Sequence, residues 1–463
     1  MKQRLNIPER GDILVLALVL VSLVGLAEIP LFDVLLGEQQ VTVTQGSSEE
    51  AMQVAEAGID YYQWHLAHYP TDYQDGTGQA GPYTHTYTDF ATQSQVGTFQ
   101  LTITAPPTGS TIVTIQSTGW TTANPNVRRT ITAQYGIPSL AVNAFLTNSP
   151  IWIGSDESVG GQMQSNSLVR FDGTGNAPIM SAVATGTCPS SMGSPCPATE
   201  NGVFGSASAS VKAFWKYPVP AVDFSTLTSD LATLKSEAQT GGIYLSPSNA
   251  KGYSLVFNSN GTVSVYKVTS LKSNPTGWDV NGTAHNEYTD YQNRTLQFTK
   301  AIPSNGIIYI EDNAWVEGTV NGRVLVAAAE LPYNPSTAPT IYIPNNITYP
   351  AKDGSSVLGL LAQNNVVVTY HAPTNLEVDA AMIAQNGSVQ FFYYPNDIKT
   401  SIYVFGSIIT YGQWTWTWVD SGNNDVSGYQ NTNDTYDGNL LYKPPPGFPL
   451  SSSGYQQLTW SSN

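Results

Sequence analysis

Apolar residues are most concentrated near the start of the chain, where residues 13–27 read ILVLALVLVSLVGLA without a charge. Apolar character continues to Leu36, through a stretch that also holds Glu28, Pro30 and Asp33. A helix needs about 20 apolar residues to cross the hydrocarbon of a bilayer, and charges within lipid are costly. The pattern predicts a membrane-spanning helix with a polar outer end.

The charges around this run predict its orientation. Lys2, Arg4 and Arg10 precede the run, and the next Lys or Arg is Arg128. Because basic residues favour the cytoplasmic side, we expect a single-pass protein with a cytoplasmic N-terminus and its bulk exported to the cell surface or periplasm. A cleaved secretory signal is the alternative, but no small-residue cleavage pattern follows the run.

Beyond this run the apolar spacing becomes helical, with apolar residues recurring at intervals of three and four and acidic residues outside that stripe. The stripe consists of Met52, Ala55, Ile59, Tyr62 and Leu66. Pro70 marks the stop. We therefore expect one helix over residues 12–69, first membrane-spanning and then amphipathic.

From residue 96 to residue 135 the periodicity changes to two, in three segments separated by Pro-Pro and Asn-Pro turn signals. This pattern predicts three antiparallel strands packed on the exported half of the helix, in a small domain over residues 70–137.

Short β-branched segments follow at similar intervals, clearest from residue 306 onward. The sequence LLAQNN at 360–365 matches MIAQNG at 382–387 after a shift of 22 residues. Repeats of this length with Asn or Gly corners are typical of a parallel β-solenoid. A β-sandwich also gives many short strands and stays an alternative.

Residues 174–300 look like insertions on that scaffold. They hold a predicted helix over Ser225–Thr240, a hairpin over Tyr253–Thr269, and the two cysteines, Cys188 and Cys196. A short loop closed by two cysteines in an exported chain predicts a disulfide. Zinc would need further ligands, and the five histidines are scattered away from the pair.

The fold class expected is mainly β, with a long N-terminal helix and small antiparallel sheet followed by a parallel β-helix-like domain with insertions. The segments are a leader (1–11), the helix (12–69), the small β domain (70–137), a first solenoid segment (138–173), insertions (174–300), the solenoid (301–419) and an extended tail (420–463).

Composition agrees with an exported, turn-rich protein. Of 463 residues 11% are charged, with 34 acids against 18 bases, which disfavours nucleic acid as a partner. The 40 Gly and 29 Pro suit many turns.

The N-terminal region resembles a known family. A basic leader ending in Gly11, an apolar helix and then the pattern A-x-x-x-A-E-A-G at residues 51–58 are similar to PilX-type minor pilins and K-type pseudopilins. The resemblance implies a type IV pilus-like system and a prepilin peptidase site between Gly11 and Asp12. Two positions depart from the pattern: Asp12 stands where an apolar residue is usual, and Leu16 stands where major pilins carry Glu.

Candidate chemistry is sparse. The carboxylates that a polysaccharide-active solenoid would use are Asp156, Glu157, Asp172, Glu311, Asp312, Glu317 and Asp379. They form no hydrolase or lyase motif, so we expect no catalytic residue, no enzyme activity and no cofactor. A cluster of Asn and Asp at 420–437 suggests calcium as an alternative, although its spacing fits no EF-hand and we assign no metal.

Trp414, Trp416 and Trp418 alternate along one predicted strand and would share one face. Such rings can stack on sugar rings or another apolar partner. The alternative is a cap that covers the last rung of the solenoid.

These patterns favour a membrane-anchored surface protein that displays a β-solenoid as a structural or adhesive minor component of a type IV pilus-like system. The expected partners are the membrane, other pilin-like subunits and surface polysaccharide. The alternatives are a membrane-tethered scaffold outside any filament and a polysaccharide-degrading enzyme.

Overall fold

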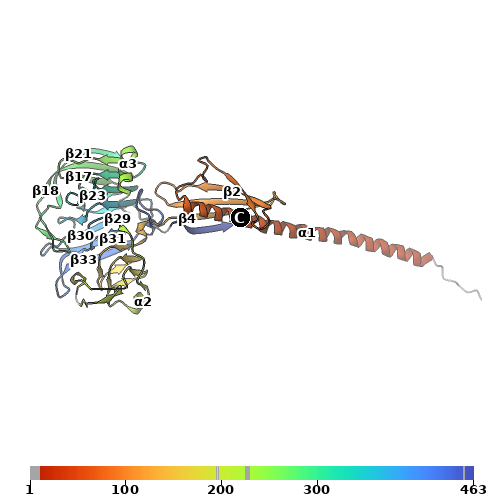
Figure 1. Ribbon diagram of the computed structural model, residues 1–463, viewed down its shortest axis with the longest axis horizontal. Coiled ribbons are helices and arrows are strands. Elements are labelled where there is room, and N and C mark those ends of the chain that lie inside the picture. Colours follow the sequence, from red (N-terminus) through yellow and green to blue (C-terminus); the bar gives the residue numbers. More distant parts are fainter. Residues whose placement is uncertain (1–10, 194, 197, 225–229, 452–453, 463) are drawn as a thin grey trace, which may run out of the picture. The chain divides into compact units, whose positions relative to one another are not determined.

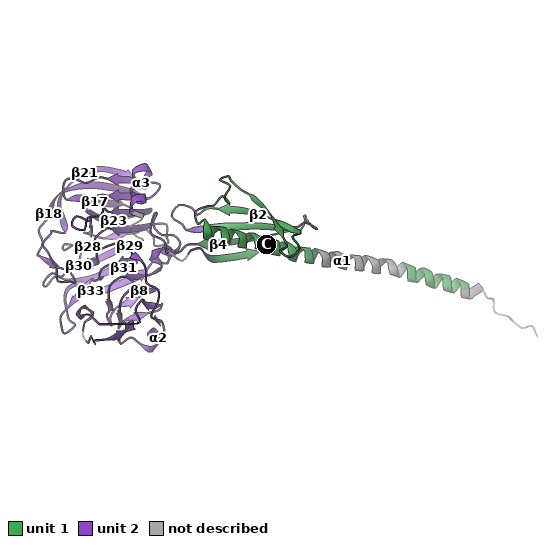
Figure 2. Ribbon diagram, viewed as in Figure 1, with its two compact units in different colours: residues 1–105, 113–135, 457–463 green, residues 106–112, 136–456 purple. Residues whose placement is uncertain are grey.

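The computed structural model describes residues 11–193, 195–196, 198–224, 230–451 and 454–462, without the side chains of residues 11–13 and 26–43. The chain forms two compact units (Figure 1, Figure 2). Unit 1 contains residues 1–105, 113–135 and 457–463, and unit 2 contains residues 106–112 and 136–456. Helix, small antiparallel sheet and large parallel-rich sheet confirm the predicted fold class.

Unit 1 is one helix on one sheet. The helix α1 spans Gly11–His68, close to the predicted range. The sheet has the order β1-β2-β3-β4-β34, with β1 antiparallel to β2 and β2 antiparallel to β3. The strands are β1 Tyr83–Thr88, β2 Gln95–Thr104, β3 Ile112–Thr121, β4 Arg128–Gly136 and β34 Gln456–Ser462. Strands β2 to β4 are the three that the sequence predicted.

The second half of α1 packs on the sheet through the predicted stripe. Ala55, Ile59, Tyr62 and Leu66 are buried, whereas Met52 is partly exposed. Small residues set the closeness of this packing. A Cβ atom on Gly119 of β3 would lie 2.3 Å from the backbone nitrogen of Ala55. Only glycine therefore fits at this point of the sheet.

Unit 2 is a parallel solenoid whose strands form three faces. The first face contains β22 Ile307–Ile310, β24 Arg323–Ala328, β27 Val357–Ala362, β29 Asn375–Ala384 and β31 Ile398–Thr410. The second contains β17 Gly252–Asn258, β23 Ala314–Thr319, β25 Ile341–Ile343, β28 Val366–Val368 and β30 Val389–Phe391. The third contains β26 Ile347–Thr348, parts of β29 and β31, β33 Asp425–Tyr436, β7 Ser158–Val159 and β10 Thr174–Gly175.

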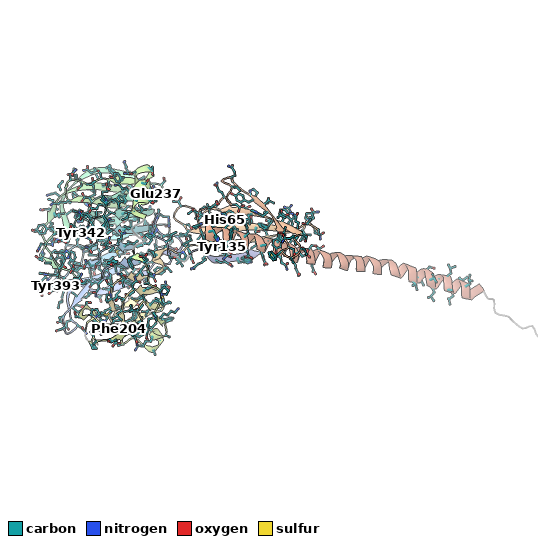
Figure 3. The ribbon with its side chains drawn as sticks, viewed as in Figure 1. His65, Tyr135, Phe204, Glu237, Tyr342 and Tyr393 are labelled. Atoms are coloured by element: carbon teal, nitrogen blue, oxygen red, sulfur yellow. A yellow bond between two sulfur atoms is a disulfide. The ribbon has the colours of Figure 1, made fainter. Side chains whose placement is uncertain are left out.

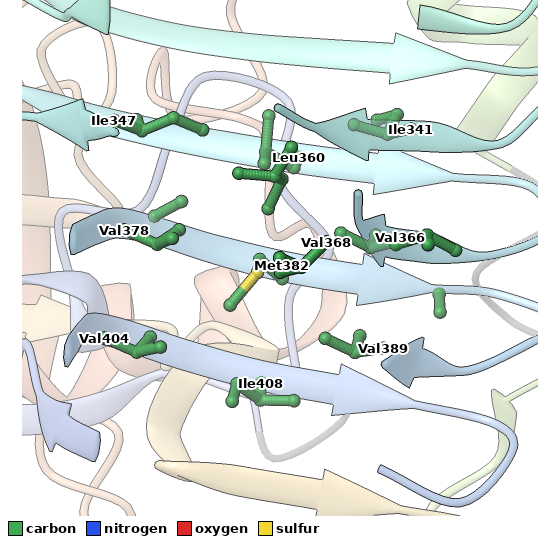
Figure 4. Close-up of a cluster of buried hydrophobic side chains, with 14 of the residues drawn as sticks. Ile341, Ile347, Leu360, Val366, Val368, Val378, Met382, Val389, Val404 and Ile408 are labelled. Atoms are coloured by element: carbon green, nitrogen blue, oxygen red, sulfur yellow. The ribbon is translucent and has the colours of Figure 1, made fainter. Parts of the chain in front are cut away.

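Equivalent residues of successive rungs stack into ladders. Figure 4 shows Leu360, Met382 and Ile408 on adjacent strands of the first face, where Leu360 pairs with Met382 and Met382 pairs with Ile408. The first of these pairs is the 22-residue match found in the sequence. The two copies of the internal sequence repeat therefore form adjacent strands that pair in register.

The chain enters this stack in its middle. Strand β31, late in the sequence, pairs in parallel with β5, the first strand of unit 2. The first face then continues through β5 Phe145–Thr147, β8 Met163–Ser165, β11 Ile179–Ser181 and β15 Trp215–Lys216, and ends on the other side with β16 Ile243–Leu245 next to β22. Residues 174–300, predicted as insertions, thus also supply rungs.

The first face is buried on both sides, which explains why its strands are almost continuously apolar. One side lines the solenoid core. The other side is covered by helix α3, Asp230–Gly241, and by Leu440 and Phe448 of the C-terminal segment. The helix predicted over Ser225–Thr240 ends at Gly241, while residues 225–229 of the predicted range lie outside the described residues.

Unit 2 contains further elements outside the strands of its three faces. The predicted hairpin is present as β17 and β18, and turns at Gly261 with φ of 78°. The other elements are β6 Ile151–Ile153, β9 Val169–Phe171, β12 Thr185–Gly186, β13 Glu200–Asn201, β14 Val203–Phe204, β18 Thr262–Lys272, β19 Gly277–Trp278, β20 Ala284–His285, β21 Asp290–Ala301, β32 Thr417–Val419, α2 Ala209–Lys212 and the 3-10 turns η1 Leu140–Val142, η2 Ser190–Met192 and η4 Gly438–Leu441. The tail predicted as extended thus contains β33, η4 and β34.

Candidate functional site

The three tryptophans of the predicted aromatic face lie in different environments. Trp414 and Trp416 are buried, with 6% and 1% of their surface exposed, and Trp414 packs edge-on against Phe145 with ring centroids 4.9 Å apart. Trp418 is partly exposed, and its indole nitrogen donates to the carbonyl of Phe391 at 2.9 Å. Two of the rings therefore fill the solenoid core, which fits the alternative of a covering role better than a platform of three exposed rings.

The candidate carboxylates are not gathered in one place, and most of them hold the fold together. The contacts are Asp172 with Arg170, Glu317 with Arg294, and Asp379 with Lys352, each at 2.8 Å, Glu311 with Lys235, and Asp312 with the Ser248 amide at 2.8 Å. A buried carboxylate that keeps its charge needs such a partner. Four ion pairs and one hydrogen bond from a backbone amide thus give each of these five acids a partner in the fold.

Glu157 belongs to a second group of acids, which form no ion pair with the basic residues that the structure describes. Burial, reinforced by the charge of Asp156, raises the pKa of Glu157 to about 7, although the Gly154 amide donates to it at 2.7 Å. Burial and the charge of Glu157 raise the pKa of Asp434 to about 8. Asp434 lies on β33, which pairs with β7 at Val159. This acid pair therefore lies where late and early strands of unit 2 meet.

A polar cluster that the sequence did not reveal surrounds Asp290. Its carboxylate accepts from the Thr369 hydroxyl at 2.6 Å and lies 3.0 Å from Nδ1 of His371. Lys399 is buried nearby, donates to the carbonyl of Tyr370 at 2.9 Å, and has a pKa lowered by burial. Asp290 and His371 are 81 positions apart, so no local motif could have indicated this contact.

The predicted disulfide is confirmed, since Cys188 and Cys196 are bonded. Cys188 packs in a small apolar cluster with Leu168, Met192 and Phe204. The disulfide therefore closes a surface loop that packs on its own small apolar cluster.

The Asn- and Asp-rich segment, considered for calcium, forms capped turns. The Asp420 carboxylate accepts from the amides of Gly422 and Asn424 at 2.8 and 2.9 Å. Asp437 accepts from the Asn439 amide at 3.0 Å. Across the part of the chain that the structure describes, no group of three or more His, Cys, Asp or Glu residues is arranged to hold a metal ion.

The first half of α1 carries the largest run of exposed apolar side chains described. Nine residues within 14–24 have between 49% and 72% of their surface exposed. They are Leu14, Val15, Leu16, Leu18, Val19, Leu20, Val21, Leu23 and Val24. Because consecutive residues point in all directions around a helix, this segment is apolar all round.

The membrane span predicted for residues 13–36 extends beyond this segment. The side chains of residues 26–36 lie outside those described, and so does that of Asp12 at the predicted processing site. Within the described residues, no helix is both long enough and apolar enough to cross a membrane. Processing between Gly11 and Asp12 and the complete span stay predictions.

Comparison with known proteins gives little. No protein-family model and no curated protein matches the chain. Among solved structures, the chain is similar to the crystal structure of the competence-associated pilin ComZ from Thermus thermophilus. The identity is 13% and the TM-score 0.30, over 90% of this chain and 97% of that chain. A likeness of this size carries no inference about this protein.

Proposed function

We propose that the protein is a pilin-like, membrane-anchored surface subunit that displays a β-solenoid as a structural and adhesive minor component of a type IV pilus-like system. The observation that carries this proposal is the exposed apolar segment at residues 14–24. A soluble chain rarely leaves such a segment in water.

The energetic argument is direct. Full burial of a Leu or Val side chain is worth about 1.5–3 kcal/mol, so burying nine half-exposed side chains is worth on the order of 10 kcal/mol. A helix that is apolar all round is typical of a membrane span or of the centre of a helix bundle. Both environments exist for a pilin-like subunit, before and after its incorporation into a filament.

The two described parts of α1 have different surroundings. Ala51, Ala55 and Gly58 face the sheet of unit 1, where a Cβ on Gly58 would collide with Phe99 and Ser117. The small residues of the A-x-x-x-A-E-A-G pattern thus serve close packing of helix on sheet. Residues 14–24 lie outside this small-residue pattern, and their exposed side chains can contact another partner.

The proposal is tested with a tagged full-length chain in its own cells. We expect mass spectrometry to find a mature chain that begins at Asp12, and we expect the protein in sheared surface filaments. An intact Met1 in membrane fractions alone would favour the alternative of a tethered scaffold outside any filament.

A matched pair of variants tests the apolar segment. Leu18→Asp with Leu20→Asp should release the chain from membrane and filament fractions, because charges are costly in an apolar environment. Trp64→Asp, at an exposed position on the other half of α1, is the control and should leave the location unchanged. Retention of the double variant in both fractions would contradict the proposal.

A further inference from the structure

A row of three partly exposed aromatic rings crosses the outside of the solenoid. The rings belong to Trp278, Tyr393 and Trp418, none of which is fully buried. The ring centroids of Trp278 and Tyr393 lie 6.0 Å apart, and those of Tyr393 and Trp418 lie 5.8 Å apart. Figure 3 shows Tyr393 at the outer margin of unit 2.

Backbone hydrogen bonds join the segments that carry these rings. Trp278 and Tyr393 exchange two backbone hydrogen bonds, at 3.1 and 2.9 Å. On the other side, Phe391 donates its amide to the carbonyl of Thr415 at 3.0 Å, and the Trp418 indole donates to the carbonyl of Phe391 at 2.9 Å. The three rings therefore come from three neighbouring backbone segments that are already ordered before binding.

The charges near the row disfavour an anionic ligand. Asp279 pairs with His285 at 3.2 Å and Asp397 pairs with Lys399 at 3.7 Å, whereas Asp420, two positions after Trp418, accepts hydrogen bonds from Gly422 and Asn424. The whole chain has a net charge of −16. Like charges would repel phosphates, nucleic acids and acidic polymers.

We infer that this row, Trp278–Tyr393–Trp418, is a binding site for a neutral polysaccharide. A sugar ring presents C–H groups on its faces, and such groups pack on aromatic rings. Neighbouring rings of the row are inclined to one another by 54° and 63°, so the row is an angled surface. Beside these aromatic rings, Val419, the residue after Trp418, is also exposed. The inference specifies the ligand class for the adhesive part of the proposed function, and it concerns the solenoid alone.

The test is affinity electrophoresis of the purified full-length chain in gels that contain one soluble polysaccharide. The neutral probes are hydroxyethyl cellulose, galactomannan, xyloglucan and soluble starch, and polygalacturonate is the acidic probe. We expect retardation by at least one neutral probe and none by polygalacturonate. No retardation by any neutral probe, or equal retardation by polygalacturonate, would overturn the inference.

Variants assign the binding to the row. Trp278→Ala, Tyr393→Ala and Trp418→Ala should each weaken binding about tenfold or more, the size expected for one aromatic anchor. Tyr393→Phe keeps the ring and should bind within about twofold of the parent chain. Tyr333→Ala removes another exposed ring of unit 2 and should have no effect.

Melting temperatures separate binding from folding. If an alanine variant unfolds, the conservative changes Trp278→Phe and Trp418→Tyr replace it, and they should show intermediate affinity. Undiminished binding by folded variants of all three positions would overturn the inference. Because the gel uses purified protein, its outcome is independent of whether the chain enters a filament.

Discussion

Unit 1 and unit 2 both pack a helix on a sheet, but they achieve this with opposite kinds of residues. In unit 1, the backbone of Ala51 and Ala55 in α1 lies directly against Gly119 of β3, and Gly58 of α1 lies against Phe99 and Ser117. In unit 2, large side chains fill the space between α3 and the first face, among them Leu231, Leu234 and Tyr309. The helix–sheet contact of unit 1 leaves no room for a larger side chain. The helix–sheet contact of unit 2 needs large side chains to fill the space between the helix and the sheet.

The two kinds of packing tolerate different substitutions. A close backbone contact fails when a side chain grows, because backbone atoms cannot turn away. A stack of apolar ladders fails when a side chain shrinks, because the neighbouring rungs are held in register and cannot close the cavity. We therefore expect that enlarging a side chain at the close contact destabilises unit 1, and that shortening a side chain of a ladder destabilises unit 2.

The largest effect is expected for Met382→Ala in unit 2. Met382 is fully buried between Leu360 and Ile408 in its ladder, and removal of such a side chain costs about 2–5 kcal/mol. Differential scanning calorimetry of the full chain should show a lower melting temperature for the transition of unit 2. Leu296→Ala, at a position with 52% exposure, is the control and should change it little. Equal effects of both variants would contradict the ladder as a core.

Gly119→Ala should give the next largest effect and should act on unit 1. The added Cβ would lie 2.3 Å from the nitrogen of Ala55 and 2.5 Å from the carbonyl oxygen of Ala51, which costs about 1–3 kcal/mol. Gly46→Ala is the matched control, because Gly46 lies in α1 with no heavy atom within 4 Å of its added Cβ. That variant should be more stable by about 0.5–1 kcal/mol. Calorimetry that finds the same sign for both changes would refute the close contact.

The sequence predicted the parts of the fold that depend on local patterns. The stripe of α1, the strands of residues 96–135, the hairpin at Gly261 and the 22-residue register all follow from spacing within a few dozen residues. It did not predict that β5 pairs with β31, or that β34 returns to β4. These contacts join residues more than 250 positions apart, and alternation alone does not specify which strands become neighbours.

The same limit applies to the candidate sites. The disulfide was predictable because its cysteines are eight positions apart. The spacing of Trp414, Trp416 and Trp418 indicated a shared face, but it carried no information on whether that face points into the core. The row of Trp278, Tyr393 and Trp418 comes from three segments that are distant in the sequence, so no local motif indicates it.

An intermediate effect is expected from the acids that join β7 and β33. Burial and Asp156 raise the pKa of Glu157 from 4.5 to about 7, so the folded chain holds a proton that the unfolded chain has lost. Stability therefore falls as pH rises from about 4.5 to about 7, and the raised pKa of Asp434, about 8, extends this loss upward. Glu157→Gln should remove part of the loss, about 1–3 kcal/mol at pH 8.

The measurement is chemical denaturation of unit 2 at pH 5 and pH 8. Glutamine keeps an oxygen that accepts from the Gly154 amide, so the change removes a charge without removing that hydrogen bond. Glu50→Gln, an exposed change on α1, is the control and should not alter the pH dependence. A parent chain that is more stable at pH 8 than at pH 5, with the Glu157 variant showing the same trend, would contradict the assignment.

The smallest effect concerns the hairpin of β19 and β20, which carries Trp278. Burial lowers the pKa of His285, but hydrogen bonds and charges from Glu287 and Asp279 outweigh it, so the pKa is raised overall. The folded chain then holds an extra proton above the ordinary value of 6.5, and stability is lost as pH rises through the folded pKa. Glu287 is half exposed, so the effect should be about 1 kcal/mol or less.

Hydrogen exchange of the Trp278 amide, which donates to the carbonyl of Tyr393 at 3.1 Å, reports this effect locally. After correction for intrinsic exchange, its protection should fall more between pH 6 and pH 9 than that of the Met382 amide, which follows the loss assigned to Glu157 and Asp434. His285→Gln should remove this difference between the two amides. An equal loss of protection at both amides would mean that the hairpin unfolds with the rungs and not before them. Separate behaviour would show that the aromatic row has one member on a segment less stable than the ladders beneath it.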